Sequence, residues 1–315
     1  MLSDDELLRY SRQILMPRFD IAGQEKLQSA RVLVIGAGGL GCPVALYLGA
    51  AGVGTLTLVD DDTIELANLQ RQIGFETSLL GESKAESLAD RIRRINPLVS
   101  VTALNQRLEG EALTRTVAEE TLVVDCTDNF NTRFALNRAC VASKIPLVSG
   151  AAIRGEGQVS VYDSRREDSP CYHCLYPEQG NEDLTCSEAG VIAPLVGMIG
   201  ATQAMEAIKV ISGVGSPLVG RLLIARLPGG LFREARPMLS NRRASVECAG
   251  LRILDLLCFT ARLLVGANIL GIELSLGDGI LLAFDLQKNI VLAKLKCLPH
   301  TRPIHSHLPT ATMSS

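Results

Sequence analysis

A glycine-rich turn between an apolar run and a helical pattern constrains the fold of this chain more than any other feature. The run 32–35 ends in Gly36-Ala-Gly38-Gly39-Leu-Gly41, and an apolar helical pattern starts at Leu40. Glycine lets backbone N–H groups approach a phosphate, and the helix N-terminus adds a positive dipole end. Asp60 closes the next apolar run, where an acid can bind a ribose hydroxyl. The pattern favours an adenine nucleotide over a turn without a ligand, and it leaves NAD and ATP open.

Strand and helix patterns alternate after an amphipathic helix expected over residues 7–28 and interrupted near Pro17. We expect strands at 32–35, 56–59, 99–104, 122–126 and 146–149, and helices from 40 and over 83–96, 109–119 and 131–143. Further strands at 158–162, 221–226 and 231–235 surround a long helix over 191–211. We therefore predict an α/β fold with a Rossmann-like doubly wound sheet, whose N-terminal half is parallel and whose C-terminal extension is antiparallel.

Composition bounds the class of protein. The chain has 315 residues and a formal net charge of −3, and it holds no tryptophan. A nucleic-acid surface needs a concentrated basic stripe, so we expect no nucleic-acid partner. Nine cysteines and an acidic, polar N-terminus suggest reduced thiols in the cytoplasm. The uncharged run between Glu188 and Glu206 is marginal for a membrane span, and a buried helix is the favoured interpretation.

The composition changes beyond Gly250, first to leucine-rich segments and then to a tail rich in Pro, His, Ser and Thr. We expect an ATP-binding domain over 1–250 and an atypical extension over 251–315, with the last part disordered.

Two polar clusters accompany the glycine turn, and the first suits a triphosphate better than a dinucleotide. Asn68-Leu69-Gln70-Arg71 follows Asp60, and Lys84 begins the next helix. Amide, guanidinium and ammonium groups near a phosphate loop fit several phosphates, although a solvated helix start is the alternative. Asp128 follows a buried strand at the ligand-binding edge of an open α/β sheet, where it could hold Mg²⁺. The alternative is that Asp128 caps the helix that begins near Asn131.

Two cysteine motifs carry possible chemistry. Cys171-Tyr-His-Cys174, with Cys248 far downstream, fits half of a four-thiolate zinc site. A redox pair or incidental free thiols are the alternatives, but no thioredoxin-like βαβ pattern surrounds the pair. Cys186 lies in a polar loop before the long helix, where a thiol can act as a nucleophile or be a passive small residue.

Taken in order, these residues resemble the ubiquitin-activating-like adenylyltransferases, the HesA/MoeB/ThiF family. The resemblance runs from about Ser3 to Gly250. Its motifs are Leu8-Arg-Tyr-Ser-Arg-Gln13, the glycine turn, Asp60, Asn68-Leu-Gln-Arg-Gln72, Lys84, Asp125-Cys-Thr-Asp-Asn129, Cys171-Tyr-His-Cys174 and Thr185-Cys186. Val148-Ser-Gly-Ala-Ala-Ile-Arg-Gly-Glu-Gly157 resembles the molybdopterin-synthase (MoeB) branch more than the thiamine (ThiF) branch.

The resemblance implies a homodimeric nucleotidyltransferase of molybdenum cofactor biosynthesis. It would use ATP and Mg²⁺ to adenylylate the C-terminal glycine of a small ubiquitin-like sulfur carrier, the small subunit of molybdopterin synthase, before a donor protein supplies sulfur. It implies nucleotide contacts from Gly36, Gly38, Gly39, Gly41, Asp60, Asn68, Leu69, Gln70, Arg71, Lys84, Asp128 and Asn129. Asp60 would bind ribose, and Asp128 would hold magnesium. Arg12 would reach into the partner subunit's site, and Cys186 matches a cysteine that forms a covalent link in some members.

The chain departs from the family pattern at its far end. The family closes its zinc site with a second Cys-x-x-Cys, whereas this chain has Ser245-Val-Glu-Cys248. A serine hydroxyl is a poor substitute for a thiolate, so the site could be three-coordinate with water, recruit Cys258 or be empty. The last segment matches no appended domain, and its His and Cys residues fit a disordered tail better than a metal site.

Three other functions compete with this interpretation. The same reaction on the thiamine sulfur carrier is the nearest. A Rossmann oxidoreductase would leave Arg71, Lys84 and the 125–129 run unexplained. A non-catalytic dimeric scaffold that binds the carrier would not need Arg12, Asp60 or Asp128, whereas the altered zinc end would fit it.

Overall fold

The computed structural model describes residues 2–176, 190–226, 231–235, 273–276, 280–285 and 290–295. The chain divides into two compact units, Met1–Ala244 and Ser245–Ser315. The boundary expected at residue 250 and the tail expected to be disordered lie outside the described residues, so that division of domains stays a prediction.

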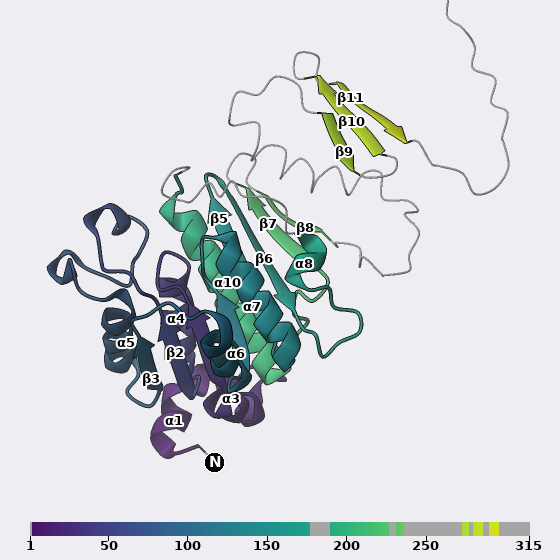
Figure 1. The fold of residues 1–315 in the computed structure, drawn as a ribbon. Helices are drawn as coiled ribbons and strands as arrows, with labels where there is room; N and C mark the ends of the chain where they lie inside the picture. Colours follow the sequence, from purple (N-terminus) through teal and green to yellow (C-terminus); the bar gives the residue numbers. More distant parts are fainter. Residues whose placement is uncertain are drawn as a thin grey trace, which may run out of the picture. The chain divides into compact units, whose positions relative to one another are not determined.

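The first unit contains one eight-stranded sheet in the order β3-β2-β1-β4-β5-β6-β7-β8 (Figure 1). Its strands are β1 (Arg31–Ile35), β2 (Thr55–Val59), β3 (Ser100–Leu104), β4 (Leu122–Asp125), β5 (Leu147–Ile153), β6 (Glu156–Tyr162), β7 (Leu222–Arg226) and β8 (Leu231–Ala235). The strands from β3 to β5 pair in parallel, and those from β5 to β8 pair antiparallel. The predicted doubly wound sheet with an antiparallel extension is confirmed.

The helices fall close to the expected ranges. They are α1 (Asp4–Arg9), α2 (Ser11–Ile14), α3 (Asp20–Ser29), α4 (Gly41–Ala51), α5 (Lys84–Ile95), α6 (Gly110–Ala118), α7 (Phe130–Ser143), α8 (Tyr172–Leu175) and α10 (Ala193–Ser212), with short 3₁₀ turns η1 (Leu66–Asn68) and η2 (Thr77–Leu79). Ser83 caps α5, as expected, by accepting a hydrogen bond from the Glu86 N–H. The helix expected over 7–28 is divided into α1, α2 and α3. The interruption expected near Pro17 is confirmed, since the backbone turns left-handed at Arg18 and Asp20, where α3 begins. A second break falls at Tyr10, between α1 and α2.

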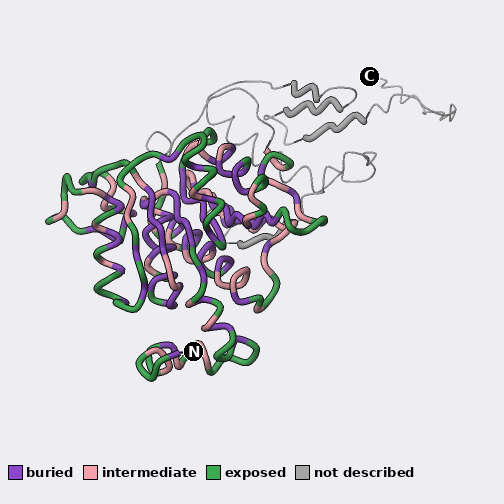
Figure 2. The backbone as a smooth tube through the Cα atoms, turned by 60° about the horizontal axis from the view of Figure 1, so that its bottom comes forward, coloured by how far each residue is buried: buried purple, intermediate pink, exposed green. Residues whose placement is uncertain are grey.

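Alternate residues of the parallel strands face opposite layers of helices. In β1, Val32 and Val34 belong to the core cluster that includes residues of α4, α5 and α10, whereas Leu33 and Ile35 belong to the cluster that includes residues of α6 and α7. This period of two fits strands buried on both faces. Figure 2 shows buried backbone through the centre of the sheet and exposed backbone around it.

Helix α10 is a core helix of this unit. By length and composition alone it could cross a membrane, but half of its apolar window is buried inside the protein. It packs on α4, β5 and β6, and its buried residues include Leu195, Ile199 and Ala207. This burial agrees with the interpretation of a buried helix.

The second unit contains a three-stranded antiparallel sheet in the order β11-β10-β9. Its strands are β9 (Glu273–Leu276), β10 (Ile280–Asp285) and β11 (Ile290–Leu295).

Candidate functional site

The glycine turn joins β1 to α4 at the carboxyl edge of the parallel strands. Gly36 has a φ of +93°, which a side chain would strain, and a Cβ atom there would lie 2.8 Å from the Cys126 carbonyl oxygen. A Cβ atom on Gly41 would lie 1.8 Å from the Gly36 carbonyl oxygen. These two positions therefore need glycine, because the turn folds tightly on itself and against the segment after β4. The backbone can then approach a ligand closely above the start of α4.

Asp60 ties the end of β2 to the glycine turn. Its Oδ2 atom accepts a hydrogen bond from the Ala37 N–H at 2.6 Å, and its Oδ1 atom accepts one from the Asp62 N–H at 2.9 Å. Burial raises the pKa of the Asp60 carboxyl, although these two hydrogen bonds and the Lys84 charge act in the opposite direction. A half-buried carboxylate is thus fixed beside the turn, where it can accept a hydrogen bond from a hydroxyl group.

Arg71 lies against the glycine turn. Its Cγ atom would be 3.4 Å from a Cβ atom on Gly39, and its guanidinium donates to Asn68 Oδ1 at 3.0 Å. Asn68 ends η1, and Leu69 and Gln70 follow it in the turn that leads to Arg71. The structure thus brings the predicted 68–71 cluster to the glycine turn.

Lys84 reaches the same edge through an ion pair. Its Nζ atom lies 2.7 Å from Asp62 Oδ2, and its side chain is 5% exposed, whereas that of Asp62 is 68% exposed. The Lys84 N–H also donates to the Asp62 carbonyl oxygen. Since the Asp62 N–H donates to Asp60, a continuous set of contacts leads from Lys84 to the glycine turn.

The segment after β4 places Asp128 on the other side of the turn. Asp128 is exposed, and Asn129 rather than Asp128 caps α7 by accepting a hydrogen bond from the Thr132 N–H at 2.9 Å. The capping role considered for Asp128 is therefore wrong. A Cβ atom on Gly36 would lie 3.4 Å from the Thr127 backbone nitrogen, so this segment packs directly on the glycine turn.

Arg12 lies near the opposite end of α4 from this edge. It is exposed on α2, and the side chain of the neighbouring Gln13 donates to the Ala51 carbonyl oxygen at the last residue of α4. The glycine turn stands at the first residue of α4, which is 11 residues long. At 1.5 Å per residue, the two ends of α4 are about 16 Å apart.

The cysteine motif lies on α8, away from the glycine turn in sequence. The Sγ atoms of Cys171 and Cys174 are 3.6 Å apart, and both residues are at least partly accessible. Two thiolates on a tetrahedral zinc ion, each about 2.3 Å from the metal, would be about 3.8 Å apart. The pair therefore fits half of a zinc site. Cys186, Ser245, Cys248 and Cys258 lie outside the described residues.

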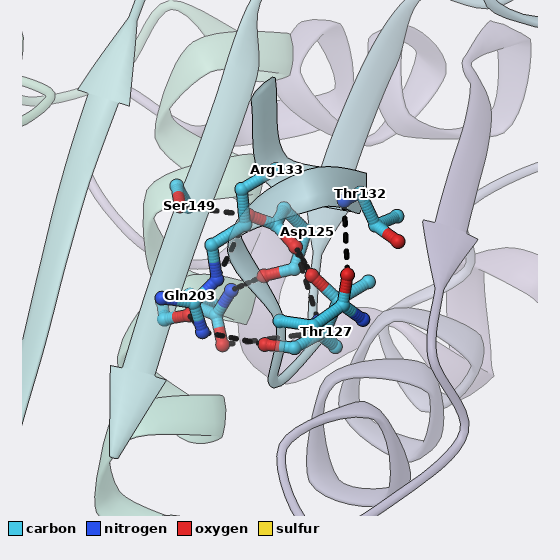
Figure 3. Close-up of polar contacts among 9 residues, drawn as sticks. Asp125, Thr127, Thr132, Arg133, Ser149 and Gln203 are labelled. Atoms are coloured by element: carbon cyan, nitrogen blue, oxygen red, sulfur yellow. Dashed lines mark hydrogen bonds and ion pairs between the residues drawn. The ribbon is translucent and has the colours of Figure 1, made fainter. Parts of the chain in front are cut away.

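Asp62, Arg133, Ser149 and Gln203 were missed as site residues. Asp62 and Lys84 are 22 residues apart, so only the acidic run 60–62 could have suggested the ion pair. Arg133 and Ser149 lie against the buried carboxylate of Asp125, and Gln203 donates to the Asp125 backbone carbonyl oxygen (Figure 3). Nothing in the spacing of three residues on three different elements predicts that arrangement.

Several known proteins are similar to this chain. The ThiF family model matches residues 10–248. The chain is 51% identical to the molybdopterin-synthase adenylyltransferase of Salmonella typhimurium over 237 residues, which are 75% of this chain and 95% of the relative. It is 47% identical to the sulfur carrier protein ThiS adenylyltransferase of Escherichia coli over 244 residues, 78% of this chain and 95% of that relative. Among solved structures it is similar to E. coli MccB crystallised with ATP, with a TM-score of 0.64, 24% identity and coverage of 74% of this chain and 72% of that one. At that identity the structural likeness shows the fold alone.

Proposed function

Because the chain belongs to the ThiF family, we propose that it catalyses ATP-dependent adenylylation of the C-terminal glycine of a small ubiquitin-like sulfur carrier. The observation that carries this proposal is 51% identity to a molybdopterin-synthase adenylyltransferase over 95% of that relative's length. We infer that the carrier is the small subunit of molybdopterin synthase and ends in Gly-Gly.

The reaction is a nucleotidyl transfer. A carboxylate oxygen of the carrier's last glycine attacks the α-phosphorus of ATP, the bond to the β-phosphate oxygen breaks, and pyrophosphate leaves. The product is an acyl-adenylate, whose carbonyl carbon can then accept sulfur from a donor protein. No protein group needs to form a covalent bond to the substrate in this step. The site therefore acts by positioning the two substrates and by neutralising charge.

The described residues supply groups that suit these tasks. The amides of the glycine turn and the start of α4 suit phosphate oxygens, and Asp60 suits the ribose hydroxyls. Asn68, Arg71 and Lys84 suit the triphosphate. ATP carries more negative charge than Asp60 and Asp62 together, so it can compete with these two acids for the ammonium group of Lys84. The exposed carboxylate of Asp128, an oxygen donor, fits Mg²⁺, which would neutralise phosphate charge when bound.

The assembly and the second metal are further parts of the proposal. Arg12 would act in the site of the partner subunit, which is supported by its place at the opposite end of α4 from the glycine turn. Zn²⁺ would be held by Cys171, Cys174 and Cys248, and Cys186 would take part in sulfur transfer. Cytoplasmic location is supported by the free thiols of the cysteines that the structure describes.

The direct test is exchange of labelled pyrophosphate into ATP. The protein is incubated with Mg²⁺, ATP and either the molybdopterin carrier or the thiamine carrier, each with its Gly-Gly end or with that end removed. We expect exchange with the intact molybdopterin carrier and much slower exchange with the thiamine carrier, to whose adenylyltransferase the chain is 47% identical. No exchange with either intact carrier would reject the proposal.

A second measurement separates the reaction class. Only a ligand that binds the folded state raises the midpoint of thermal unfolding. ATP with Mg²⁺ should raise the midpoint and NAD should not. The opposite preference would support an oxidoreductase, whereas nucleotide binding without exchange would support a carrier-binding scaffold.

A further inference from the structure

A buried arginine holds the turn that presents Asp128. Arg133 lies in the first turn of α7 and is 8% exposed. Its guanidinium donates to the Thr127 carbonyl oxygen at 2.6 Å and to the Gly150 carbonyl oxygen at 3.5 Å, and its Nε atom lies 4.0 Å from Asp125 Oδ2 (Figure 3). One side chain thus contacts the end of β4, the turn after it and the neighbouring strand β5.

The carboxylate of Asp125 completes this arrangement. It is fully buried, and it accepts hydrogen bonds from the Thr127 N–H at 3.0 Å, the Thr127 hydroxyl at 2.7 Å and the Ser149 hydroxyl at 2.9 Å. The backbone carbonyl oxygen of Asp125 accepts a hydrogen bond from Gln203 Nε2 at 2.7 Å. A buried charge is tolerated only when it is paired and hydrogen-bonded. For the carboxylate, Thr127 and Ser149 supply the hydrogen bonds, and the guanidinium of Arg133 supplies the nearby opposite charge.

These contacts fix Asp128 from both sides. Before it, Thr127 is held by Asp125 and Arg133. After it, Asn129 is held by its cap on α7. Because the segment packs on Gly36, the position of Asp128 relative to the glycine turn is set by groups that do not themselves reach the exposed edge.

We propose that Arg133 is a positioning residue for the adenylylation reaction, which holds the Thr127 carbonyl so that the Asp128 carboxylate meets the magnesium of bound ATP. The inference rests on the proposed function. Lysine keeps the charge of Arg133 but donates from a single nitrogen, so it cannot span Thr127, Gly150 and Asp125 at once. Misplacing a reacting group by about 1 Å can cost on the order of 100-fold in rate.

The test compares Arg133→Lys with Ser149→Ala, which removes one donor to Asp125, and with the control Arg115→Lys on the exposed side of α6. In Arg133→Lys we expect kcat of carrier-dependent exchange to fall about 100-fold, while KM for ATP changes less than about threefold, because Asp60 and the glycine turn remain in place. If Arg133 contributed to stability alone, Arg133→Lys would lower Tm but would not lower kcat selectively over KM. Ser149→Ala should show the same split at several-fold size, and Arg115→Lys should match the wild type.

A binding readout separates positioning from turnover. The dissociation constant of Mn²⁺ in the complex with a non-hydrolysable ATP analogue is measured by electron paramagnetic resonance. We expect it to rise about tenfold in Arg133→Lys and several-fold in Ser149→Ala, since a displaced Asp128 is a poorer ligand. If Arg133→Lys fails to fold, Ser149→Ala carries the test.

The outcomes distinguish two failures. If the wild type exchanges pyrophosphate and the folded variants keep its kcat and Mn²⁺ affinity, the positioning role is wrong and the proposed function stands. If the wild type exchanges with neither carrier, the proposed function is rejected, and the positioning role with it.

Discussion

The Nζ atom of Lys84 lies 2.7 Å from Oδ2 of Asp62, so the ammonium group expected to bind phosphate is held by a carboxylate of its own chain. Lys84 is buried, whereas Asp62 is mostly exposed. Nucleotide phosphates would therefore replace Asp62 as the partner of an ammonium group that already lies at this edge of the sheet.

The first prediction follows from that ion pair. Because the Asp62 carboxylate is mostly exposed and water competes for it, we expect the pair to be worth about 1 kcal/mol or less. Asp62→Asn should therefore tighten ATP binding by no more than about fivefold at low salt. The gain should shrink at high salt, where screening weakens the pair. Titration calorimetry measures the affinity, and Asp61→Asn is the matched control, since it removes the same charge from the neighbouring exposed residue. Weaker binding by Asp62→Asn alone would mean that Asp62 contributes to the nucleotide site.

Asp128 gives the second prediction. Asp128→Ala should reduce pyrophosphate exchange by at least about 100-fold, because it removes the carboxylate proposed to hold magnesium next to the reacting phosphates. The free energy of unfolding should change by less than about 0.5 kcal/mol, because the side chain is exposed and does not cap α7. Denaturant unfolding and exchange assays check the two parts, and Asp128→Asn should be nearly as inactive. Near-normal exchange in either variant would contradict the magnesium assignment.

Local pattern predicted most of the fold because the strands are buried on both faces and the helices have clear ends. Ser83 before α5 and the glycine turn before α4 are such signals. Pro17 predicted the break before α3, whereas no proline or glycine marks the break at Tyr10 between α1 and α2. Strand β5 extends to Ile153, beyond the predicted 149, because it pairs along its length with β6.

The residues next to the glycine turn were predictable, and the contacts that support Asp128 were not. Asp60 and the 68–71 cluster follow directly from the chain's order at the sheet edge. Arg133 and Asp125 act through groups that different elements bring together, with Gln203 78 residues from Asp125. Such contacts depend on the register of β4 against β5 and on the docking of α10, which no local pattern encodes.

The third prediction concerns pH. Burial raises the pKa of the Asp60 carboxyl, and only its charged form can accept hydrogen bonds from the ribose through both oxygens. Adenosine affinity should therefore fall as the pH is lowered. The fall should begin at a higher pH than it would if Asp60 had the pKa of an ordinary aspartate. Since the folded state binds this proton more tightly than the unfolded chain, the same group favours folding less as pH rises through its range.

Adenosine is the probe for that experiment because it has no phosphates to titrate. Fluorescence or calorimetric titrations across the acid range measure its affinity. Asp60→Asn should bind weakly at every pH and lose the acid-side dependence. An unchanged pH profile in that variant would assign the dependence to another group.

The fourth prediction tests the cysteine pair on α8. Cys171→Ala should lower stability by at least about 1 kcal/mol, or roughly 2–4 °C in Tm, if the pair holds zinc. Elemental analysis should find zinc in the wild type and less in the variant. Cys140→Ala is the control, since it removes a buried free thiol outside the pair and should leave the zinc content unchanged. An unchanged Tm in Cys171→Ala, with no zinc in the wild type, would show that no metal is held there.

The last prediction uses the separation of Arg12 from the glycine turn along α4. Arg12→Ala and Asp128→Ala should each be inactive as pure proteins, because each lacks one part of every site. Consider a homodimer in which each site takes Asp128 from one subunit and Arg12 from the partner. In a mixed dimer of the two single variants, one site lacks both residues and the other site is complete. Random reassociation of equal amounts makes half of the dimers mixed, so about a quarter of the wild-type activity should return.

Exchange assays after the two variants are mixed and refolded together measure this recovery. A mixture of Asp128→Ala with Lys84→Met is the control, since each site takes both of these residues from the same subunit and no mixed dimer has a complete site. If Arg12 acted within its own subunit, the two variants would not complement each other, because in the mixed dimer each site would still lack one of the two residues.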